Sequence, residues 1–407
     1  MRLADVDLFD PDVYMANGVP HEAMRVLRNE DPVHFHKEPG GPGFWAITKY
    51  DDVMAVGKDP HTFSSFRGGT NIQDYPPDNL STIQLLMLNM DPPQHNKFRK
   101  LASKGFTPRM VAAMEPKIRD ACRGIVDSIA ERGECDFVRT VSAELPLVVI
   151  CDLIGVPQEE RGKLFDWSNR LIGFDDPEFQ TSLEDGRMAA MEMWMYANGL
   201  AEGRKGKNGE DLVTVLINAE IEGERLTEME FDAFFLLLAV AGNETTRNAI
   251  SGGMLALFEN PEQWARLTKD QTLVGGAIEE ILRWVTPVNY FRRTATKDTQ
   301  IRGKSIKEND KVCMYYSSAN RDEDVFGQSS MTFDISRSPN EHLAFGGGQH
   351  FCLGASLAKL EMRLLFEEIA RRLPDLQLAG KPRRLRSNFI NGVKEIPVRF
   401  TPESKRR

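Results

Sequence analysis

A glycine-rich loop that ends in a cysteine is the most specific chemical feature of the sequence. It reads Phe-Gly-Gly-Gly-Gln-His-Phe-Cys-Leu-Gly at 345–354, and it places Cys352 at the start of a helix predicted from Leu353 to Leu373. Unpaired N–H groups and partial positive charge at a helix start lower the pKa of a thiol and hold its anion. The loop therefore predicts a thiolate that is either a metal ligand or a catalytic nucleophile.

A second group of polar residues interrupts an apolar helix. The sequence Ala-Gly-Asn-Glu-Thr-Thr at 241–246 places a carboxylate and two hydroxyls beside Gly242. A buried carboxylate is costly unless it has a partner or a purpose. Glu244 is therefore either ion-paired, with Thr245 bonded to its own backbone, or the two side chains form an acid–alcohol pair that takes part in chemistry.

A third pair of charged residues lies on another predicted helix, from Leu273 to Trp284. Glu280 and Arg283 are three residues apart, so their side chains share one helix face. Most such pairs are solvated, but this helix is otherwise apolar. The pair is either a surface pair or a structural ion pair.

The elements that must position these residues are mostly helices. The helix that carries residues 241–246 begins with a capping box at Thr227 and runs to about Phe258. Its middle, from Phe234 to Ala241, is apolar all round, as expected of a buried central helix. Short apolar runs between turn signals predict small strands within residues 30–65 and 285–335.

The composition is that of an ordinary globular protein. The 407 residues contain no repeat or long linker, so we expect one domain over residues 1–407. The first ten residues have no apolar core and the longest apolar run has nine residues, so we expect a cytoplasmic protein without a membrane anchor. A net charge of -9 argues against a nucleic-acid binder. Five widely spaced cysteines indicate no disulfide framework and no standard zinc site.

One segment departs from the acidic average. No acidic residue occurs from Pro92 to Met114, whereas five basic residues do: Lys97, Arg99, Lys100, Lys104 and Arg109. The segment is either a solvated helix face or a docking patch for an acidic partner.

Taken together, the three motifs resemble those of the cytochrome P-450 monooxygenases. The family pattern Phe-Gly-x-Gly-x-His-x-Cys-x-Gly is matched at 345–354, Glu-x-x-Arg at 280–283 and Ala-Gly-x-Glu-Thr at 241–245. The likeness extends over essentially the whole chain, including Asp-Pro-Pro-Gln-His at 91–95 and Ala-Asn-Arg-Asp at 319–322. It implies a mainly α, triangular helical domain with small β-sheets, similar to bacterial soluble members.

The resemblance implies that the cofactor is haem b and that Cys352 is its iron ligand. A thiolate ligand donates electron density to the iron and favours O–O cleavage. The resemblance assigns His95, Arg99, Arg293 and His350 to the haem propionates. It places Ala241, Gly242, Phe345, Gly346 and Gly354 against the same cofactor.

The resemblance also assigns roles to the two acidic motifs. Glu244 and Thr245 would be catalytic, relaying protons to oxygen, and Gly242 would loosen the central helix to make room for O2. Glu280 and Arg283 would be structural, together with Arg337.

The implied activity is hydroxylation of an unactivated C–H bond in a hydrophobic small molecule with O2 and two electrons. The donors would be a ferredoxin and its ferredoxin reductase, because no electron-transfer domain is fused to this chain, and the protein would be a monomer. Two alternatives are a haem-thiolate peroxygenase or rearrangement enzyme and a non-catalytic haem gas sensor. The acid–alcohol pair counts against the first, and the second would need a signalling domain.

The substrate pocket implied by similarity carries no formal charge, which suits a terpenoid, steroid or alkyl chain. Its expected members are Leu86, Val240, Val288, Asn289, Tyr290 and Ile390. A methionine-rich stretch from Met188 to Met195 is either helix core or part of an adaptable roof over the substrate.

Overall fold

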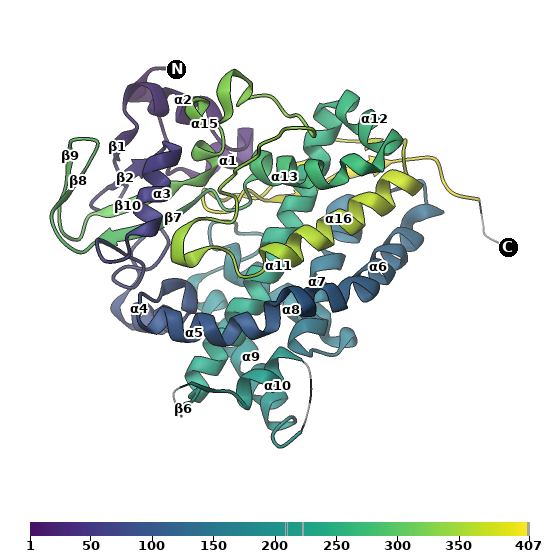
Figure 1. The fold of residues 1–407 in the computed structure, drawn as a ribbon, viewed down its shortest axis with the longest axis horizontal. Helices are drawn as coiled ribbons and strands as arrows, with labels where there is room; N and C mark the ends of the chain where they lie inside the picture. The colour runs from purple at the N-terminus through teal and green to yellow at the C-terminus, as the bar shows by residue number, and fades with distance from the viewer. Residues whose placement is uncertain (208, 210, 222–223, 405–407) are drawn as a thin grey trace.

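The long central helix predicted from the sequence is present. In the computed structural model, which describes residues 1–207, 209, 211–221 and 224–404, helix α11 spans Glu228–Glu259. Thr227 is its N-cap, and the side chains of Thr227 and Glu230 form the expected capping box. The helix passes through the middle of the molecule (Figure 1).

Helices surround α11 on most sides, in a molecule that is broad at one end and narrows to the other (Figure 1). The mainly α fold is therefore as predicted. The other α-helices among the described residues are α1 (Pro11–Asn17), α2 (His21–Glu30), α3 (Tyr50–Lys58), α4 (Pro77–Ile83), α5 (Gln94–Ala102), α6 (Pro108–Ala130), α7 (Glu144–Ile154), α8 (Arg161–Ile172), α9 (Leu183–Glu202), α10 (Leu212–Ile217), α12 (Pro261–Lys269), α13 (Val274–Val285), α14 (Tyr316–Ala319), α15 (Glu323–Phe326) and α16 (Ala355–Arg372).

The small strands also occur where the sequence predicts them. The largest sheet has the order β1 (Val33–His36), β2 (Phe44–Ile47), β10 (Lys311–Tyr315), β7 (Tyr290–Ala295) and β3 (Phe63–Ser64), with β10 parallel to β2 and the other pairs antiparallel. The smaller sheets pair β4 (Glu134–Asp136) and β11 (Gln377–Leu378) with β14 (Pro397–Arg399), β12 (Arg383–Arg384) with β13 (Val393–Glu395), β5 (Glu220–Ile221) with β6 (Glu224–Arg225), and β8 (Thr299–Ile301) with β9 (Lys304–Ile306).

The main apolar core lies where α7, α13 and α16 pack on α11 and where α6 packs on α7 and α16. Residues of β1, β2, β7 and β10 contribute to two smaller apolar clusters. Among the described residues, no helix is long and apolar enough to cross a membrane.

The structure corrects two details of the predicted helices. Helix α16 begins at Ala355, two residues later than the predicted start at Leu353, so Cys352 lies in the loop that precedes the helix. The middle of α11 is not buried all round, because Leu237, Leu238 and Ala241 line a cavity. An apolar pattern on every face cannot distinguish packing against protein from packing against a ligand.

Candidate active site

An internal cavity brings most of the predicted site residues together. It holds about 1500 Å³ of space not filled by protein atoms, including its opening to solvent. Its lining includes eleven of the predicted residues, namely His95, Arg99, Ala241, Gly242, Thr245, Val288, Phe345, Gly346, His350, Cys352 and Gly354.

Cys352 enters the cavity from a tightly folded loop. The backbone N–H of Cys352 donates to the carbonyl oxygen of Phe345 at 2.9 Å, which closes the loop before α16. Gly348 has a φ of 68°, and a Cβ at this position would overlap the carbonyl oxygen of Gly57 in α3. The loop therefore needs glycine here both for its conformation and for its packing.

The sequence predicts a lowered pKa for the Cys352 thiol, and this prediction is wrong for the protein without a bound metal. Burial raises the pKa of this thiol, although the backbone N–H of Gly354 and the charge of Arg99 act in the opposite direction, as a helix start should. A bound metal cation deprotonates a coordinating thiol. The loop thus favours a sulfur that becomes a thiolate when it binds a metal.

Four basic side chains gather at one end of the cavity. The rings of His95 and His350 are 4.1 Å apart, and burial lowers the pKa of Arg293. Burial, followed by the charges of Arg293, His95 and Arg99, lowers the pKa of His350 to about 2. Within the described part of the chain, neither arginine forms an ion pair with a carboxylate. Buried cations without an anion require one from a ligand, and haem propionates fit this requirement.

Arg293 takes part in this cluster although it does not line the cavity. It is buried on β7, where its guanidinium donates to the carbonyl oxygen of Arg292 at 2.9 Å. Tyr316, at the start of α14, does line the cavity, although no motif in the sequence indicates this role. A hydroxyl beside these cations adds a further donor to an anionic ligand.

Helix α11 forms the opposite wall, where Gly242 and Thr245 line the cavity. A Cβ at Gly242 would come within 2.9 Å of the Ile150 side chain, so the glycine allows α7 to approach α11 closely. The Thr245 hydroxyl donates to the carbonyl oxygen of Ala241 at 2.8 Å. The threonine is therefore bonded to its own backbone in this structure.

Glu244 does not line the cavity in this structure. Its side chain is fully buried and forms an ion pair with Arg247, which also donates to Asn169 of α8 at 2.9 Å. The other carboxylate oxygen, Oε1, has no hydrogen-bond partner. Burial raises the pKa of Glu244, with Arg247 opposing it. The ion-paired alternative therefore describes the observed geometry, and a catalytic role needs the carboxyl to turn.

Five residues predicted for the substrate pocket do not line the cavity: Leu86, Val240, Asn289, Tyr290 and Ile390. The amide of Asn289 donates to the carbonyl oxygen of Asn388 at 2.9 Å, and Tyr290 is fully buried in the sheet. Val288 and Phe291, which flank Asn289 and Tyr290 in the sequence, do line the cavity. Similarity to a family indicates which segment borders the pocket. It does not indicate which side chains of that segment face inward, because successive side chains of an extended segment point to opposite sides.

The pocket also contains residues that sequence reasoning missed. Helix α7 contributes Pro146, Val149, Ile150 and Leu153, whose spacing of three and four residues marks one helix face. Glu361 of α16 lines the cavity as well. The methionines of α9 lie elsewhere, since Met193 is core and Met188, Met191 and Met195 are exposed.

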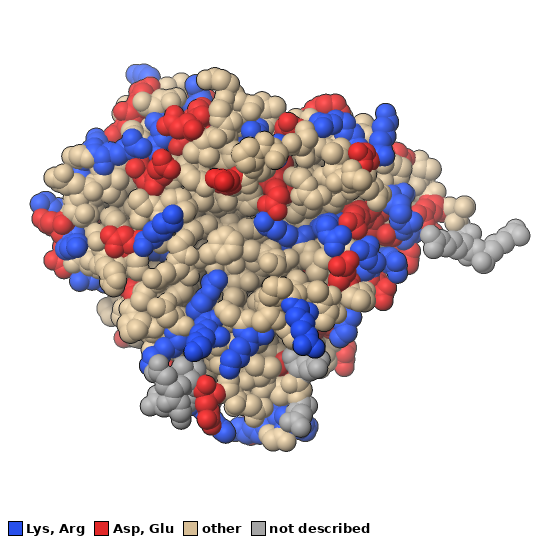
Figure 2. Space-filling view, viewed as in Figure 1, with Lys and Arg blue, Asp and Glu red and all other residues tan. Residues whose placement is uncertain are grey.

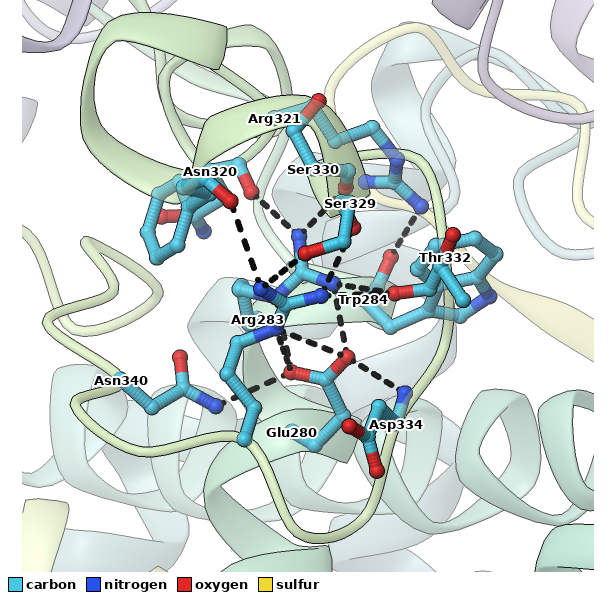
Figure 3. A network of polar contacts seen from close by, with 12 residues as sticks. Glu280, Arg283, Trp284, Asn320, Arg321, Ser329, Ser330, Thr332, Asp334 and Asn340 are labelled. Atoms are coloured by element: carbon cyan, nitrogen blue, oxygen red, sulfur yellow. Dashed lines mark hydrogen bonds and ion pairs between the residues drawn. The ribbon is translucent and has the colours of Figure 1, made fainter.

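The third motif is a structural network away from the cavity (Figure 3). Glu280 and Arg283 are both fully buried and paired at 2.7 Å. Arg337 and the amide of Asn340 also donate to Glu280, at 3.2 and 3.0 Å. Arg283 further donates to three backbone carbonyl oxygens, those of Asn320, Ser330 and Thr332. The structural alternative is therefore confirmed for this pair.

Comparison with known proteins gives consistent relatives. The family model described as Cytochrome P450 matches residues 195–374. A steroid C26-monooxygenase of Rhodococcus jostii is 44% identical over 408 residues, covering 98% of this chain and 85% of that protein. A methyl-branched lipid omega-hydroxylase of Mycobacterium tuberculosis is 42% identical over 411 residues, covering 98% and 95% respectively.

Solved structures agree with these sequence relatives. A Mycobacterium marinum cytochrome P450 in complex with pseudoionone superposes with a TM-score of 0.90 at 38% identity, covering 97% of this chain and 98% of that one. A Bacillus megaterium cytochrome P450 in complex with corticosterone gives a TM-score of 0.82 at 32% identity, covering 94% and 98%.

Proposed function

The chain belongs to the cytochrome P450 family, and on that premise we propose that it hydroxylates the terminal part of a branched apolar chain in a steroid or lipid. It is a haem b monooxygenase that acts on a lipophilic substrate. One observation carries the proposal: outside the basic cluster, most of the side chains that line the cavity are apolar. They include Met87, Leu88, Val149, Ile150, Leu153, Leu237, Leu238, Val288 and Phe291.

The relatives support this choice of substrate position. One is named for the C26 position of a steroid, a side-chain carbon, and another for the omega position of a methyl-branched lipid. Both names describe oxidation toward the end of a branched chain. An apolar cavity that excludes water binds such a chain through burial of its surface, with few polar groups to fix its orientation.

Residues that line the cavity or lie beside it have separate roles in this proposal. Cys352 ligates the iron, and Arg99, Arg293, His95 and His350 bind the propionates. The bound haem supplies the activation of O2. Thr245 and Glu244 hold and pass protons, which requires the Thr245 hydroxyl to leave the carbonyl oxygen of Ala241.

A ferredoxin, reduced by its reductase, is the proposed electron donor. Basic side chains gather over α5 and the start of α6 on the face that also presents the Cys352 loop (Figure 2). Lys100, Lys104 and Arg109 are exposed and form no ion pair with any described residue. Phe351, next to Cys352, is 46% exposed and offers an apolar contact to a partner. An acidic partner would be steered to this surface.

Substrate binding tests the proposed function. We expect a sterol with its full branched side chain, and a methyl-branched fatty acid, to shift the Soret band of the purified holoenzyme. The matched controls are the steroid nucleus without the side chain and the straight-chain acid of equal length. Mass spectrometry of the products should place the hydroxyl near the chain end. Tighter binding of the bare nucleus, or a hydroxylated ring, contradicts the proposal.

Charge reversal tests the electron donor. Lys100→Glu and Lys104→Glu should raise the KM for reduced ferredoxin and leave substrate-induced Soret shifts unchanged, because the lysines do not line the cavity. Lys297→Glu, an exposed lysine on the β7–β8 connection, serves as the control. An unchanged KM in both patch variants contradicts this docking surface.

A further inference from the structure

The outward side of α9 is apolar, although the exposed side of a surface helix is ordinarily polar. Met188, Met191 and Met195 lie three and four residues apart, so their side chains share one side of the helix. Their exposed fractions are 49%, 58% and 73%. Apolar side chains that are grouped on an exposed surface and rimmed by polar residues mark an interaction site.

The fold does not require these three methionines. The opposite side of α9, which carries Ala189, Met193 and Ala197, is buried, and α9 packs on α8 and α11. The helix lies at the narrow end of the molecule (Figure 1). Its buried side already anchors it to the protein, so the exposed methionines are available for a contact outside this chain.

A glycine extends the same side of the helix. Gly199, one turn after Met195, is exposed, and a Cβ at this position would meet no atom of the described residues within 4 Å. The missing side chain leaves room for the backbone of another helix to approach closely. We call this surface the methionine face; it consists of Met188, Met191, Met195 and Gly199.

The two ends of α9 carry opposite charges. In the first turn Glu184 is exposed, and its ion pair with Arg187 is long, at 3.8 Å. Just beyond the last turn Lys205 and Lys207 are exposed, and Lys207 forms no ion pair with any described residue. Two copies of α9 that pack antiparallel bring unlike charges together, whereas a parallel arrangement brings like charges together.

We propose that the methionine face is the interface of a homodimer, in which α9 of one protomer packs antiparallel on α9 of its partner. A two-fold axis makes such a contact self-complementary, because both copies present the same surface. Methionine side chains are unbranched and polarizable, so they adapt to one another in this contact. The dimer does not depend on the oxidation chemistry, and it departs from the monomer that the family resemblance implies.

The charges and the glycine fix the position of the axis. Met195 lies about midway along the chain between Glu184 and Lys207. An axis near Met195 therefore brings Glu184 toward Lys207 of the partner subunit. The same axis places Met191 beside Gly199 of the partner subunit, where no side chain blocks it.

A second copy fits the charges of α9 better than a lipid surface does. Helices that lie on membranes carry mainly Lys and Arg on their polar side. The charged residues of α9 are instead mainly acidic, with Arg187 as the single cation beside Glu184, Asp185, Glu192 and Glu202. One helix from each protomer is a small contact beside the roughly 800 Å² that each partner of a standard interface buries, so we expect a reversible dimer.

Sedimentation velocity of the holoenzyme over a range of micromolar concentrations tests the dimer. The wild type should shift from monomer toward dimer as the concentration rises. Met191→Glu and Met195→Glu should raise the dimer Kd by about tenfold or more, because each places a carboxylate in an apolar contact. Their haem absorbance should match that of the wild type, because neither residue lines the cavity.

The matched control is Met15→Glu, which changes an equally accessible methionine of α1 and should leave the dimer Kd unchanged. A wild type that stays monomeric at every concentration overturns the proposal. So does a dimer Kd that is the same in both α9 variants as in the wild type.

A charge exchange tests the antiparallel arrangement. Glu184→Lys and Lys207→Glu should each raise the dimer Kd by about two- to fivefold, which is the size expected for an exposed ion pair. The double variant restores unlike charges and should recover most of this loss. Glu262→Lys, on the exposed surface of α12, changes the net charge equally and should have no effect. A double variant that is weaker than both single variants overturns the antiparallel dimer.

Flotation with phosphatidylcholine vesicles tests the competing occupant. The wild-type holoenzyme should remain unbound, with or without phosphatidylglycerol in the vesicles. Flotation of the wild type that Met191→Glu abolishes would assign the methionine face to a lipid surface and overturn the proposal.

Discussion

In two of the Glu-x-x-Arg sequences of this protein both charged side chains are buried, and the surroundings of the two pairs are opposite. At 280–283 the glutamate accepts hydrogen bonds from four residues, and every nitrogen of the Arg283 guanidinium donates (Figure 3). At 244–247 the glutamate accepts from Arg247 alone, and Glu244 Oε1 and Arg247 Nε have no partner. Equal spacing and equal burial therefore do not give equal roles.

This difference in hydrogen bonding distinguishes a fixed structural network, at Glu280 and Arg283, from a pair whose side chains can rearrange, at Glu244 and Arg247. A saturated network of buried charges has one favourable arrangement, since any movement breaks several bonds at once. A pair with unsatisfied atoms loses less when it rearranges. Glu244 can therefore turn toward the cavity at a modest cost, whereas Glu280 cannot.

The largest expected effect comes from breaking the saturated network. Arg283→Met should lower the free energy of unfolding by about 3 to 5 kcal/mol, because it leaves the Glu280 carboxylate buried with fewer donors. Denaturant unfolding measures this loss, and haem retention at the thiolate Soret band reports the fold. Arg247→Met is the matched variant of the other pair and should cost clearly less. Equal losses would contradict the comparison.

The next effect concerns catalysis and not stability. Glu244→Gln should slow product formation by about 10²-fold or more, because a positioned acid contributes at least that factor. Its free energy of unfolding should fall by about 1 to 3 kcal/mol, because the amide can still accept a hydrogen bond from Arg247 but no longer balances its charge. Steady-state turnover and denaturant unfolding on the same preparation separate the two effects. A stable variant with unchanged turnover would mean that Glu244 has no role in proton transfer.

The central helix and the Cys352 loop could be predicted from the sequence because each has a strong local signal, and the fold class followed from the resemblance of the three motifs to those of a known family. A capping box marks the start of α11, and a glycine-dense loop before a helix marks the thiol. The spacing of three residues likewise predicted that Glu280 and Arg283 share one helix face. These features depend on contacts between residues close in the chain.

Features set by contacts distant in the chain were predicted less well. Asn289 and Tyr290 were expected in the pocket, but hydrogen bonds to the segment around Asn388 hold them in the sheet region. Glu361 was missed because a glutamate on an amphipathic helix ordinarily faces solvent. Only the packing of α16 against α6 and α11 buries it.

A smaller effect depends on pH. The pKa of Glu244 is raised in the folded protein, so the folded protein keeps a proton that the unfolded chain has lost above about pH 4.3. Stability of the wild type therefore falls as the pH rises from there through the folded pKa. Glu244→Gln has no carboxyl to titrate and lacks this loss. Its free energy of unfolding, relative to that of the wild type, should therefore rise by up to about 1.4 kcal/mol for each unit by which the pH is raised. Unfolding at pH 5, 6 and 7 measures this change.

The control for this pH effect is Glu262→Gln, which removes an exposed carboxylate of α12. Its stability difference from wild type should vary much less with pH. A pH-independent difference for Glu244→Gln would mean that Arg247 fully offsets the burial of the carboxyl.

The smallest effect comes from deleting one amide in each network. Asn340→Ala removes one of the donors to Glu280, and Asn169→Ala removes the acceptor of Arg247, at 3.0 and 2.9 Å. Each should cost about 1 kcal/mol, because each substitution removes one hydrogen bond and leaves the ion pair in place. Only Asn169→Ala should also shift the pH profile of turnover, because Arg247 is then free to move and Glu244 follows it. The remaining donors to Glu280 keep its position after Asn340→Ala. A shift in both variants, or in neither, would show that saturation of the hydrogen bonds does not distinguish the two pairs.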